Sequence, residues 1–170
     1  MSHDRTSHDQ VSHDRAPDVT VTVDVRRSAA DVWRAVADPR RVTAWSPEAT
    51  HVHGATLGDG PMPVGTTFSG SNRNGIFRWA TRCTVVESAP DSAFAFDVTY
   101  LGLAVARWRY AVVPTPDGCR VDEQWWDHRG APMRWLGTIG TGVADRRSHN
   151  HDTMRATLDA MRDDLERTGS

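Results

Sequence analysis

Residues 145–167 constrain the fold most strongly, because their apolar side chains follow the period of a helix. The large ones are spaced four, three and four residues apart, so they form one stripe along a helical face. They are Met154, Leu158, Met161 and Leu165. Such a stripe must pack on another apolar surface. Traced back along the helix, the same face carries Arg147, Asn150 and His151, which predicts either the polar wall of a binding cavity or a helix end that emerges into water.

A run of hairpins from Val64 onward supplies the surface on which this helix packs. Residues that favour turns occur at 72–75, 89–92 and 115–118, between stretches rich in Val, Thr and aromatic residues. These turns predict the pairs Thr66 with Thr81, Phe68 with Trp79, Gly70 with Phe77, Cys83 with Val98, Val85 with Phe96, Trp108 with Trp125, Tyr110 with Glu123 and Val112 with Val121. The registers gather the aromatic residues on one face of a single curved sheet. A slip of one residue in the strand pairing would place these residues on the solvent-exposed face.

The N-terminal part of the domain predicts one strand and two helices. Alternating valines from Val19 to Val25 are typical of a half-buried strand. Ser28 and Asp31 resemble a capping box with Asp in place of Glu, so a helix begins there and ends before Pro39. A short second helix is expected over residues 39–44.

Together these elements predict an α+β domain in which a curved antiparallel sheet wraps around a long C-terminal helix. Burial of each large residue of the helical stripe contributes about 1.5–3 kcal/mol to that packing. We assign residues 17–170 to this single domain. Residues 1–16 repeat Ser-His-Asp with a period of five and contain almost nothing apolar, so we expect them to form a disordered tail.

Composition excludes several classes of function. The net charge of −2 and the pI near 6.4 give no basic surface for nucleic acid. No apolar run reaches the roughly 18 residues of a membrane span, and the N-terminus lacks the apolar core of a signal peptide, so we expect no stable membrane insertion and a cytoplasmic location. Cys83 and Cys119 are expected to be reduced core residues. The sequence leaves the oligomeric state open.

No sequence motif points to a metal, a cofactor or an activated nucleophile. The tail histidines match no zinc-site spacing, and His51 and His53 share a strand face without a nearby third ligand. The chain contains no Gly-x-Ser-x-Gly elbow, no glycine-rich phosphate loop and no His-Glu-x-x-His motif. We therefore expect no metal and no cofactor, and hydrolase and nucleotide-dependent activities are disfavoured.

Several segments resemble the START-like (SRPBCC) superfamily, in particular its polyketide cyclase/dehydrase and lipid-transport branch. They are residues 28–33, 38–39, 45, 64–70, 79–86, 94–96, 108–110, 118–123 and the closing helix, so the resemblance extends over residues 18–167. The family implies a helix-grip fold whose sheet and C-terminal helix enclose an apolar cavity. Its members include lipid and hormone binders and aromatase/cyclases. No catalytic residue can be carried over, because no catalytic motif is shared across the family.

Glu123 is the most informative candidate for chemistry, because the predicted register places its carboxyl group on the buried aromatic face, opposite Tyr110. A buried carboxyl group needs a partner, and desolvation moves its pKa towards values useful for general acid or base catalysis. Glu123 and Tyr110 are therefore the candidate catalytic residues. Alternatively, Glu123 is a satisfied structural carboxylate or lies in water at the cavity mouth.

The predicted ligand-binding residues come from the aromatic face and from the last helix. They are Trp45, Phe68, Trp79, Phe96, Trp108, Trp125, Asn150 and Met154. The unusual number of tryptophans, seven, indicates either a pocket lining or a bulky core. Further polar contacts would come from Thr66, Asn72, Thr81 and Arg147. Met133, Trp135 and Leu136 lie among glycines and form either a mobile lid or a fixed, packed loop.

We therefore predict that the protein binds a hydrophobic small molecule, lipid-like or polyketide-like, in a cavity between the sheet and the C-terminal helix. The alternative is an aromatase/cyclase that acts on a polyketide-type substrate by general acid/base catalysis. A third hypothesis is that the protein acts through a protein partner that binds the N-terminal tail.

Overall fold

A computed structural model describes residues 15–54, 58, 60–130, 137 and 140–168. Its strands are β1 (Val19–Val25), β2 (Ala49–His53), β3 (Thr67–Asn74), β4 (Phe77–Ala89), β5 (Ala93–Tyr100), β6 (Leu103–Thr115) and β7 (Gly118–Asp127). Its helices are α1 (Ala29–Val36), α2 (Pro39–Val42) and α4 (Arg146–Thr168). The predicted α+β class is confirmed.

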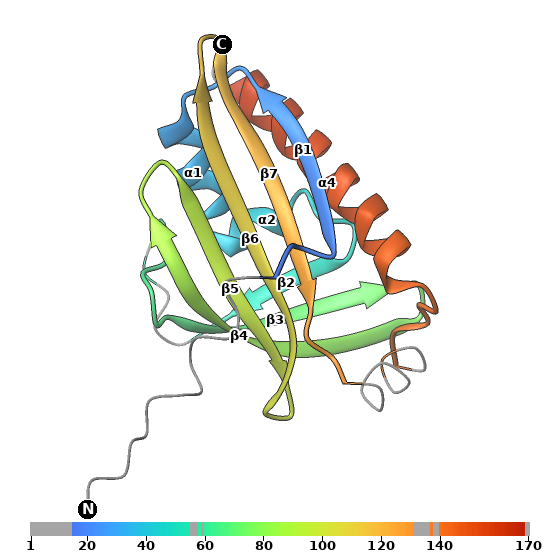
Figure 1. The fold of residues 1–170 in the computed structure, drawn as a ribbon. Helices are drawn as coiled ribbons and strands as arrows, with labels where there is room; N and C mark the ends of the chain where they lie inside the picture. Colours follow the sequence, from blue (N-terminus) through green and yellow to red (C-terminus); the bar gives the residue numbers. More distant parts are fainter. Residues whose placement is uncertain (1–14, 55–57, 59, 131–136, 138–139, 169–170) are drawn as a thin grey trace, which may run out of the picture.

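The seven strands form one antiparallel sheet in the order β1-β7-β6-β5-β4-β3-β2. The sheet is strongly curved, and α4 runs alongside β1 (Figure 1). Sequential hairpins account for the neighbours from β2 to β7, whereas β1 joins the sheet by pairing with the last strand, β7. The chain thus has the helix-grip arrangement, with the concave face of the sheet turned towards the helix.

Two of the three predicted hairpin registers are confirmed. The β6–β7 hairpin pairs Tyr110 with Glu123 and Trp108 with Trp125. The β4–β5 hairpin pairs Val85 with Phe96, and a bulge between Val85 and Glu87 follows this pair on the way to the turn.

The predicted register of the β3–β4 hairpin is wrong. Phe68 faces Cys83, and Trp79 faces Asn72. The turn consists of Gly75 and Ile76 rather than residues 72–75, because Gly75 adopts a φ of +55° at the first central position of a two-residue turn. Each partner therefore moves by four residues. An even shift keeps every side chain on its predicted face, so the aromatic face itself is as expected.

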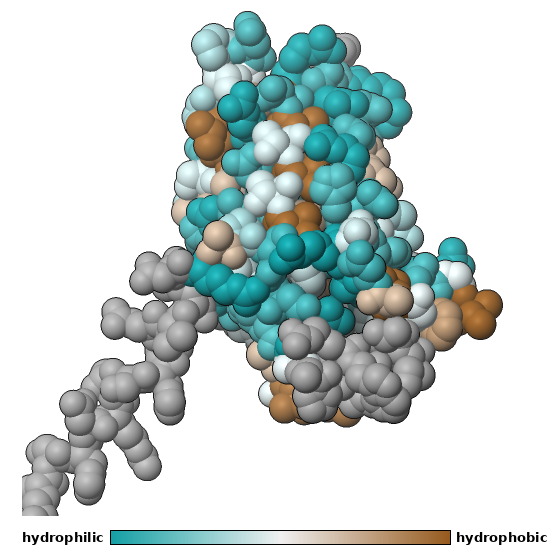
Figure 2. Space-filling view, turned by 45° about the vertical axis from the view of Figure 1, so that its right-hand side comes forward, coloured by the Kyte–Doolittle hydropathy of each residue, from teal (hydrophilic) through white to brown (hydrophobic). Residues whose placement is uncertain are grey.

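Helix α4 buries the predicted stripe. Met154, Leu158 and Met161 are almost fully buried, and Leu165 closes the stripe near the C-terminus. Asn150 is buried on the same face, whereas His151 is exposed. The outward side chains of α4 are mostly charged, and the surface on the side of β1 and α4 is largely hydrophilic with small separate hydrophobic patches (Figure 2).

The N-terminal elements close one end of the sheet. Ser28 is the predicted N-cap of α1, and its hydroxyl accepts the backbone N–H of Asp31. The Asp31 carboxylate accepts the Ser28 hydroxyl rather than the Ser28 backbone N–H, so only the first half of the predicted capping box forms. Trp33 of α1 is buried, and its indole N–H donates to the Ala93 carbonyl at 2.9 Å. In the described residues, no helix combines the length and the apolar character of a membrane span.

Candidate functional site

A cavity of about 670 Å³ lies between the concave face of the sheet and α4. This volume falls in the range of small-molecule binding pockets, about 300–1,000 Å³. Side chains from β3 to β7 form its floor, and the first turns of α4 form the opposite wall. Near the β5–β6 hairpin its lining includes Leu101 and Leu103, which are exposed, so the cavity reaches the surface there.

Five of the predicted aromatic residues line this cavity. They are Phe68, Trp79, Phe96, Trp108 and Trp125. Side chains alternate between the two faces of the sheet along each strand, and these five residues occupy positions that point to the concave face. Two ring contacts link different strands: Phe68 of β3 meets Phe96 of β5 edge to face across β4, at 5.6 Å between ring centroids, and the Trp108 and Trp125 rings of the neighbouring strands β6 and β7 are 6.4 Å apart. The floor of the cavity is therefore a rigid aromatic surface.

Glu123 and Tyr110 form a buried polar pair in this floor. The Tyr110 hydroxyl donates a hydrogen bond of 2.9 Å to Oε1 of Glu123. Both residues line the cavity, and Glu123 is only 3% exposed. Within the described residues, its second oxygen, Oε2, is buried without a hydrogen-bond partner. A buried polar atom left unpaired costs about 1–3 kcal/mol, so a further hydrogen bond to this atom would be favourable.

Burial controls the protonation state of this pair. Desolvation raises the pKa of Glu123 from 4.5 to about 8, although the hydrogen bond from Tyr110 acts in the opposite direction. Burial and the neighbouring Glu123 also raise the pKa of Tyr110 well above its usual value. At neutral pH Glu123 is therefore mostly a neutral acid that presents a proton to the cavity.

The helical wall adds hydrogen-bonding groups to the aromatic floor. Asn150, Thr153, Met154 and Thr157 of α4 line the cavity. Asn150 is 2% exposed, and its side-chain amide makes no hydrogen bond with another described residue. The cavity surface is thus mainly apolar, and among its polar lining residues Glu123, Asn150 and Thr157 are buried.

Three predicted candidates, Trp45, Arg147 and Thr66, lie outside the cavity lining. Trp45 is buried outside the cavity, and its indole N–H donates to Asp164 of α4 at 3.1 Å. Arg147 points to the side of α4 that faces β1, where it binds Asp18 at 3.0 Å. Asn72 and Thr81, in contrast, belong to the lining.

Three arginines that line the cavity, Arg78, Arg129 and Arg146, were not anticipated from the sequence. Arg146 begins α4, forms an ion pair of 2.8 Å with Glu48 and lies over the Trp79 ring at 5.4 Å. Arg129 follows β7 and forms an ion pair of 2.8 Å with Asp127.

The remaining predictions concern metals and the loop before α4. In the described part of the chain, no group of three or more His, Cys, Asp or Glu side chains is arranged to hold a metal. His51 and His53 stack on each other on β2, the strand at one edge of the sheet, with ring centroids 5.8 Å apart. Met133, Trp135 and Leu136 lie outside the described residues.

Sequence and structure comparisons give a consistent assignment of the fold. The profile of the family described as "Polyketide cyclase / dehydrase and lipid transport" matches residues 16–166. No curated protein matches the chain significantly. A polyketide cyclase-like protein from Corynebacterium glutamicum is similar in structure, with a TM-score of 0.58 and 24% identity over 87% of this chain and 90% of that one.

Two further similar structures are proteins of biosynthetic pathways. The di-domain ARO/CYC StfQ from the steffimycin biosynthetic pathway has a TM-score of 0.66 and 14% identity, over 89% of this chain and 52% of StfQ. DynU16, a putative protein in the dynemicin biosynthetic locus, has a TM-score of 0.58 and 17% identity, over 87% of this chain and 46% of DynU16. At these identities the likeness shows a shared fold.

Proposed function

The chain belongs to the polyketide cyclase/dehydrase and lipid transport family, and from this premise we propose that it binds a hydrophobic small molecule between the sheet and α4. The observation that carries the proposal is the cavity of about 670 Å³, which has an aromatic floor and a mainly apolar surface. Apolar walls supply most of the binding free energy, and the few polar groups orient the ligand. The ligand is lipid-like or polyketide-like.

Polar groups in the cavity narrow the chemistry of this ligand. The proton on Glu123 Oε2 suits an acceptor such as a ketone, ester or quinone oxygen, because Oε1 is already bound by Tyr110. The Asn150 amide offers a second donor and an acceptor from the opposite wall. A planar molecule with carbonyl groups would use the aromatic floor and both polar groups at once.

A cavity-filling variant tests the proposal directly. Gly70 lies on the cavity face of β3, and a Cβ placed there would meet only the Thr81 hydroxyl, at an ordinary 3.6 Å. Gly70→Trp should therefore insert an indole into the ligand space without backbone strain. Ser69→Trp is the matched control, because Ser69 is exposed on the opposite face of the same strand.

The readout is the affinity for a neutral fluorescent probe, N-phenyl-1-naphthylamine. Gly70→Trp should weaken its binding at least about tenfold, equivalent to about 1.4 kcal/mol, while Ser69→Trp binds like the wild type. Native mass spectrometry of the protein from its own host would then identify a retained molecule. Equal probe affinity in all three proteins, or no binding to any, would refute ligand binding in this cavity.

The Glu123–Tyr110 pair supports a second candidate function, an aromatase/cyclase. A neutral carboxylic acid can donate a proton to a carbonyl oxygen during aldol cyclisation or dehydration, and its conjugate base can remove a proton from the adjacent carbon. Its pKa of about 8 lies near physiological pH, where both forms are accessible.

The corresponding test uses a poly-β-carbonyl thioester as substrate. Glu123→Gln should abolish turnover while leaving the affinity for the neutral probe within about threefold, because the amide keeps the shape and the acceptor for Tyr110. Equal turnover in Glu123→Gln and wild type would remove Glu123 from the mechanism.

A further inference from the structure

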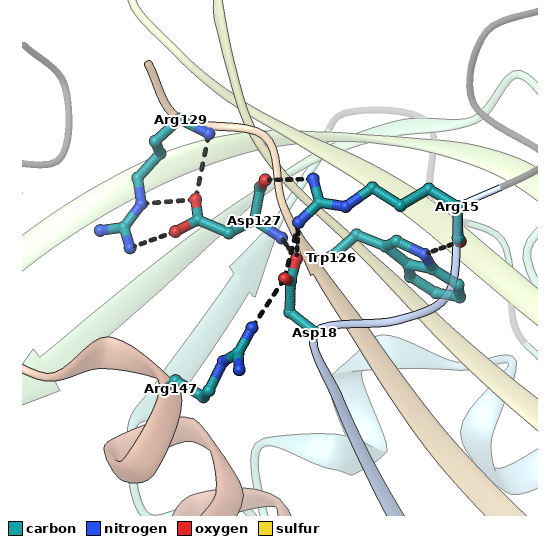
Figure 3. A network of polar contacts seen from close by, with 6 residues as sticks. All are labelled: Arg15, Asp18, Trp126, Asp127, Arg129 and Arg147. Atoms are coloured by element: carbon teal, nitrogen blue, oxygen red, sulfur yellow. Dashed lines mark hydrogen bonds and ion pairs between the residues drawn. The ribbon is translucent and has the colours of Figure 1, made fainter. Parts of the chain in front are cut away.

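A second hollow, of about 370 Å³, lies beside the cavity and differs from it in chemistry. We call it the arginine cleft. Its charged lining residues are Arg15, Arg129, Arg146, Arg147, Asp18 and Asp127. Figure 3 shows five of these six side chains gathered from the segment before β1, the end of β7 and the start of α4.

Asp18 is the centre of the ion-pair network in the cleft. Its carboxylate accepts hydrogen bonds from Arg15 at 2.6 Å, from Arg147 at 3.0 Å and from the backbone N–H of Asp127 at 2.9 Å. Partial burial acts to raise the pKa of Asp18, but these hydrogen bonds and the charge of Arg15 lower it overall. Asp18 is therefore ionised, and two guanidinium groups share its single charge.

The other two arginines are paired one to one. Arg129 makes a two-point contact with Asp127, with nitrogen–oxygen distances of 2.8 Å, and Arg146 binds Glu48. Four guanidinium groups thus face three carboxylates. Asp145 caps the first N–H groups of α4 rather than pairing with a cleft arginine side chain. With Asp145 included, the four guanidinium groups face four carboxylates, so unused guanidinium donors, rather than an excess of charge, give the cleft its capacity to bind an added anion.

Arg147 is the side chain best placed to bind an added anion. Its side chain is 67% exposed, and in the described part of the chain only Nη2 of its guanidinium is engaged in a hydrogen bond. Nε and Nη1 remain available as donors. A guanidinium group binds carboxylate and phosphate oxygens with paired, charge-assisted hydrogen bonds, which makes these groups the matching ligands.

The arginine cleft and the apolar cavity share part of their lining. Trp125, Arg129 and Arg146 belong to both. The cleft therefore lies directly against the cavity wall, next to the space in which the apolar part of a molecule on the aromatic floor would lie. Glu123, two residues before Trp125 on the same strand, does not oppose an anion there, because burial keeps its carboxyl group mostly neutral at pH 7.

We propose that the arginine cleft binds the anionic group, a carboxylate or a phosphate, of an amphipathic ligand whose apolar part occupies the cavity. This inference rests on the proposed ligand-binding function and specifies the class of ligand. It assigns Arg147 as the residue that distinguishes an anionic ligand from its neutral counterpart.

The test compares three ligands with the same alkyl chain: hexadecanoate, hexadecyl phosphate and hexadecanol. Each displaces N-phenyl-1-naphthylamine from the wild type, from Arg147→Gln and from Arg120→Gln at low ionic strength. Arg120 is the matched control, since it is an exposed arginine that pairs with Asp24 away from the cleft. Thermal unfolding of each variant establishes that the fold is intact.

The wild type should bind at least one of the two anions about tenfold more tightly than hexadecanol, as expected for a charge-assisted hydrogen bond. Arg147→Gln should lose most of that preference with hexadecanol affinity unchanged, and Arg120→Gln should keep it. Whichever anion is preferred identifies the head group. Inorganic phosphate should compete with the preferred anion but not with hexadecanol.

Two results would overturn the inference while leaving the proposed function intact. One is equal affinity of the wild type for hexadecanol and both anions. The other is an Arg147→Gln variant that retains the full preference for the anion. Failure of the neutral probe itself to bind is a different result, which would refute the proposed function and this inference together.

Discussion

The buried Glu123 carboxyl group should make the stability of this protein decrease as the pH rises. In the unfolded chain Glu123 loses its proton near its usual pKa of 4.5, whereas in the folded protein the pKa is raised to about 8. Between these values the folded state holds a proton that the unfolded state has released. The free energy of unfolding therefore falls with increasing pH across this window.

The size of the effect follows from the shift. Each unit of pKa difference corresponds to about 1.36 kcal/mol, so the window from 4.5 to about 8 amounts to about 3 to 5 kcal/mol. Below pH 4.5 Glu123 is protonated in both the folded and the unfolded state, so its titration does not lower the free energy of unfolding. Above pH 8 it is ionised in both, and the loss is complete. This is a large share of the stability of an ordinary domain, about 5–15 kcal/mol.

Glu123→Gln isolates this contribution. The glutamine side chain is neutral at every pH, has the same shape and still accepts the hydrogen bond from Tyr110. The variant should match the wild type near pH 5 and exceed it by about 3 to 5 kcal/mol near pH 9, as measured by urea unfolding at each pH. All other titrating groups are common to both proteins and cancel in the difference.

Tyr110→Phe provides a second, independent check. It removes the hydrogen bond that holds the pKa of Glu123 down, so the upper end of the window should move to higher pH. A stability difference between wild type and Glu123→Gln that stays constant from pH 5 to pH 9 would refute the reasoning, because it would mean that Glu123 titrates alike in both states.

Three further substitutions test the packing. Leu158→Ala should lower the free energy of unfolding by about 2–5 kcal/mol, because Leu158 is fully buried between α4 and the sheet; urea titration measures this. Gly118→Ala should destabilise by about 1–3 kcal/mol in the same assay, since its Cβ would collide with the Val25 carbonyl and push β7 from β1. Ser28→Ala removes the N-cap of α1 and should cost about 1 kcal/mol, seen as a lower thermal midpoint; an unchanged midpoint would show that the cap contributes nothing.

The Tyr110–Glu123 pair could be predicted from the sequence because its hairpin has a well-marked turn. Pro116, Asp117 and Gly118 leave few ways to connect β6 and β7, and the register then follows by counting. The β3–β4 turn is less determined, since asparagines and glycine that all favour turns occur at 72–75. Gly75 adopts a positive φ and therefore sets the position of the turn, which displaces the predicted pairs by four residues.

The flank of α4 that faces the cavity could not be read from its periodicity. The apolar stripe fixes which side of the helix is buried, but the curvature of the sheet decides which polar neighbours of the stripe are covered. Arg146, Asn150 and Thr157 lie on the flank turned to the cavity, whereas Arg147 lies on the flank turned to β1. The same holds for Trp45, whose indole N–H finds a carboxylate partner on α4 instead of a ligand.

The pairing of β1 with β7 determines when this protein can fold during its synthesis. Thr22 on β1 hydrogen-bonds Asp122 on β7, a contact between residues 100 positions apart. At about 5–20 residues per second, the ribosome needs roughly 5–20 s to make the intervening chain. During that time the valines of β1 have no strand to pair with, and α4, which packs on β1, emerges later still. The domain is therefore expected to complete its sheet only around release from the ribosome, with the slow folding typical of non-local strand pairing.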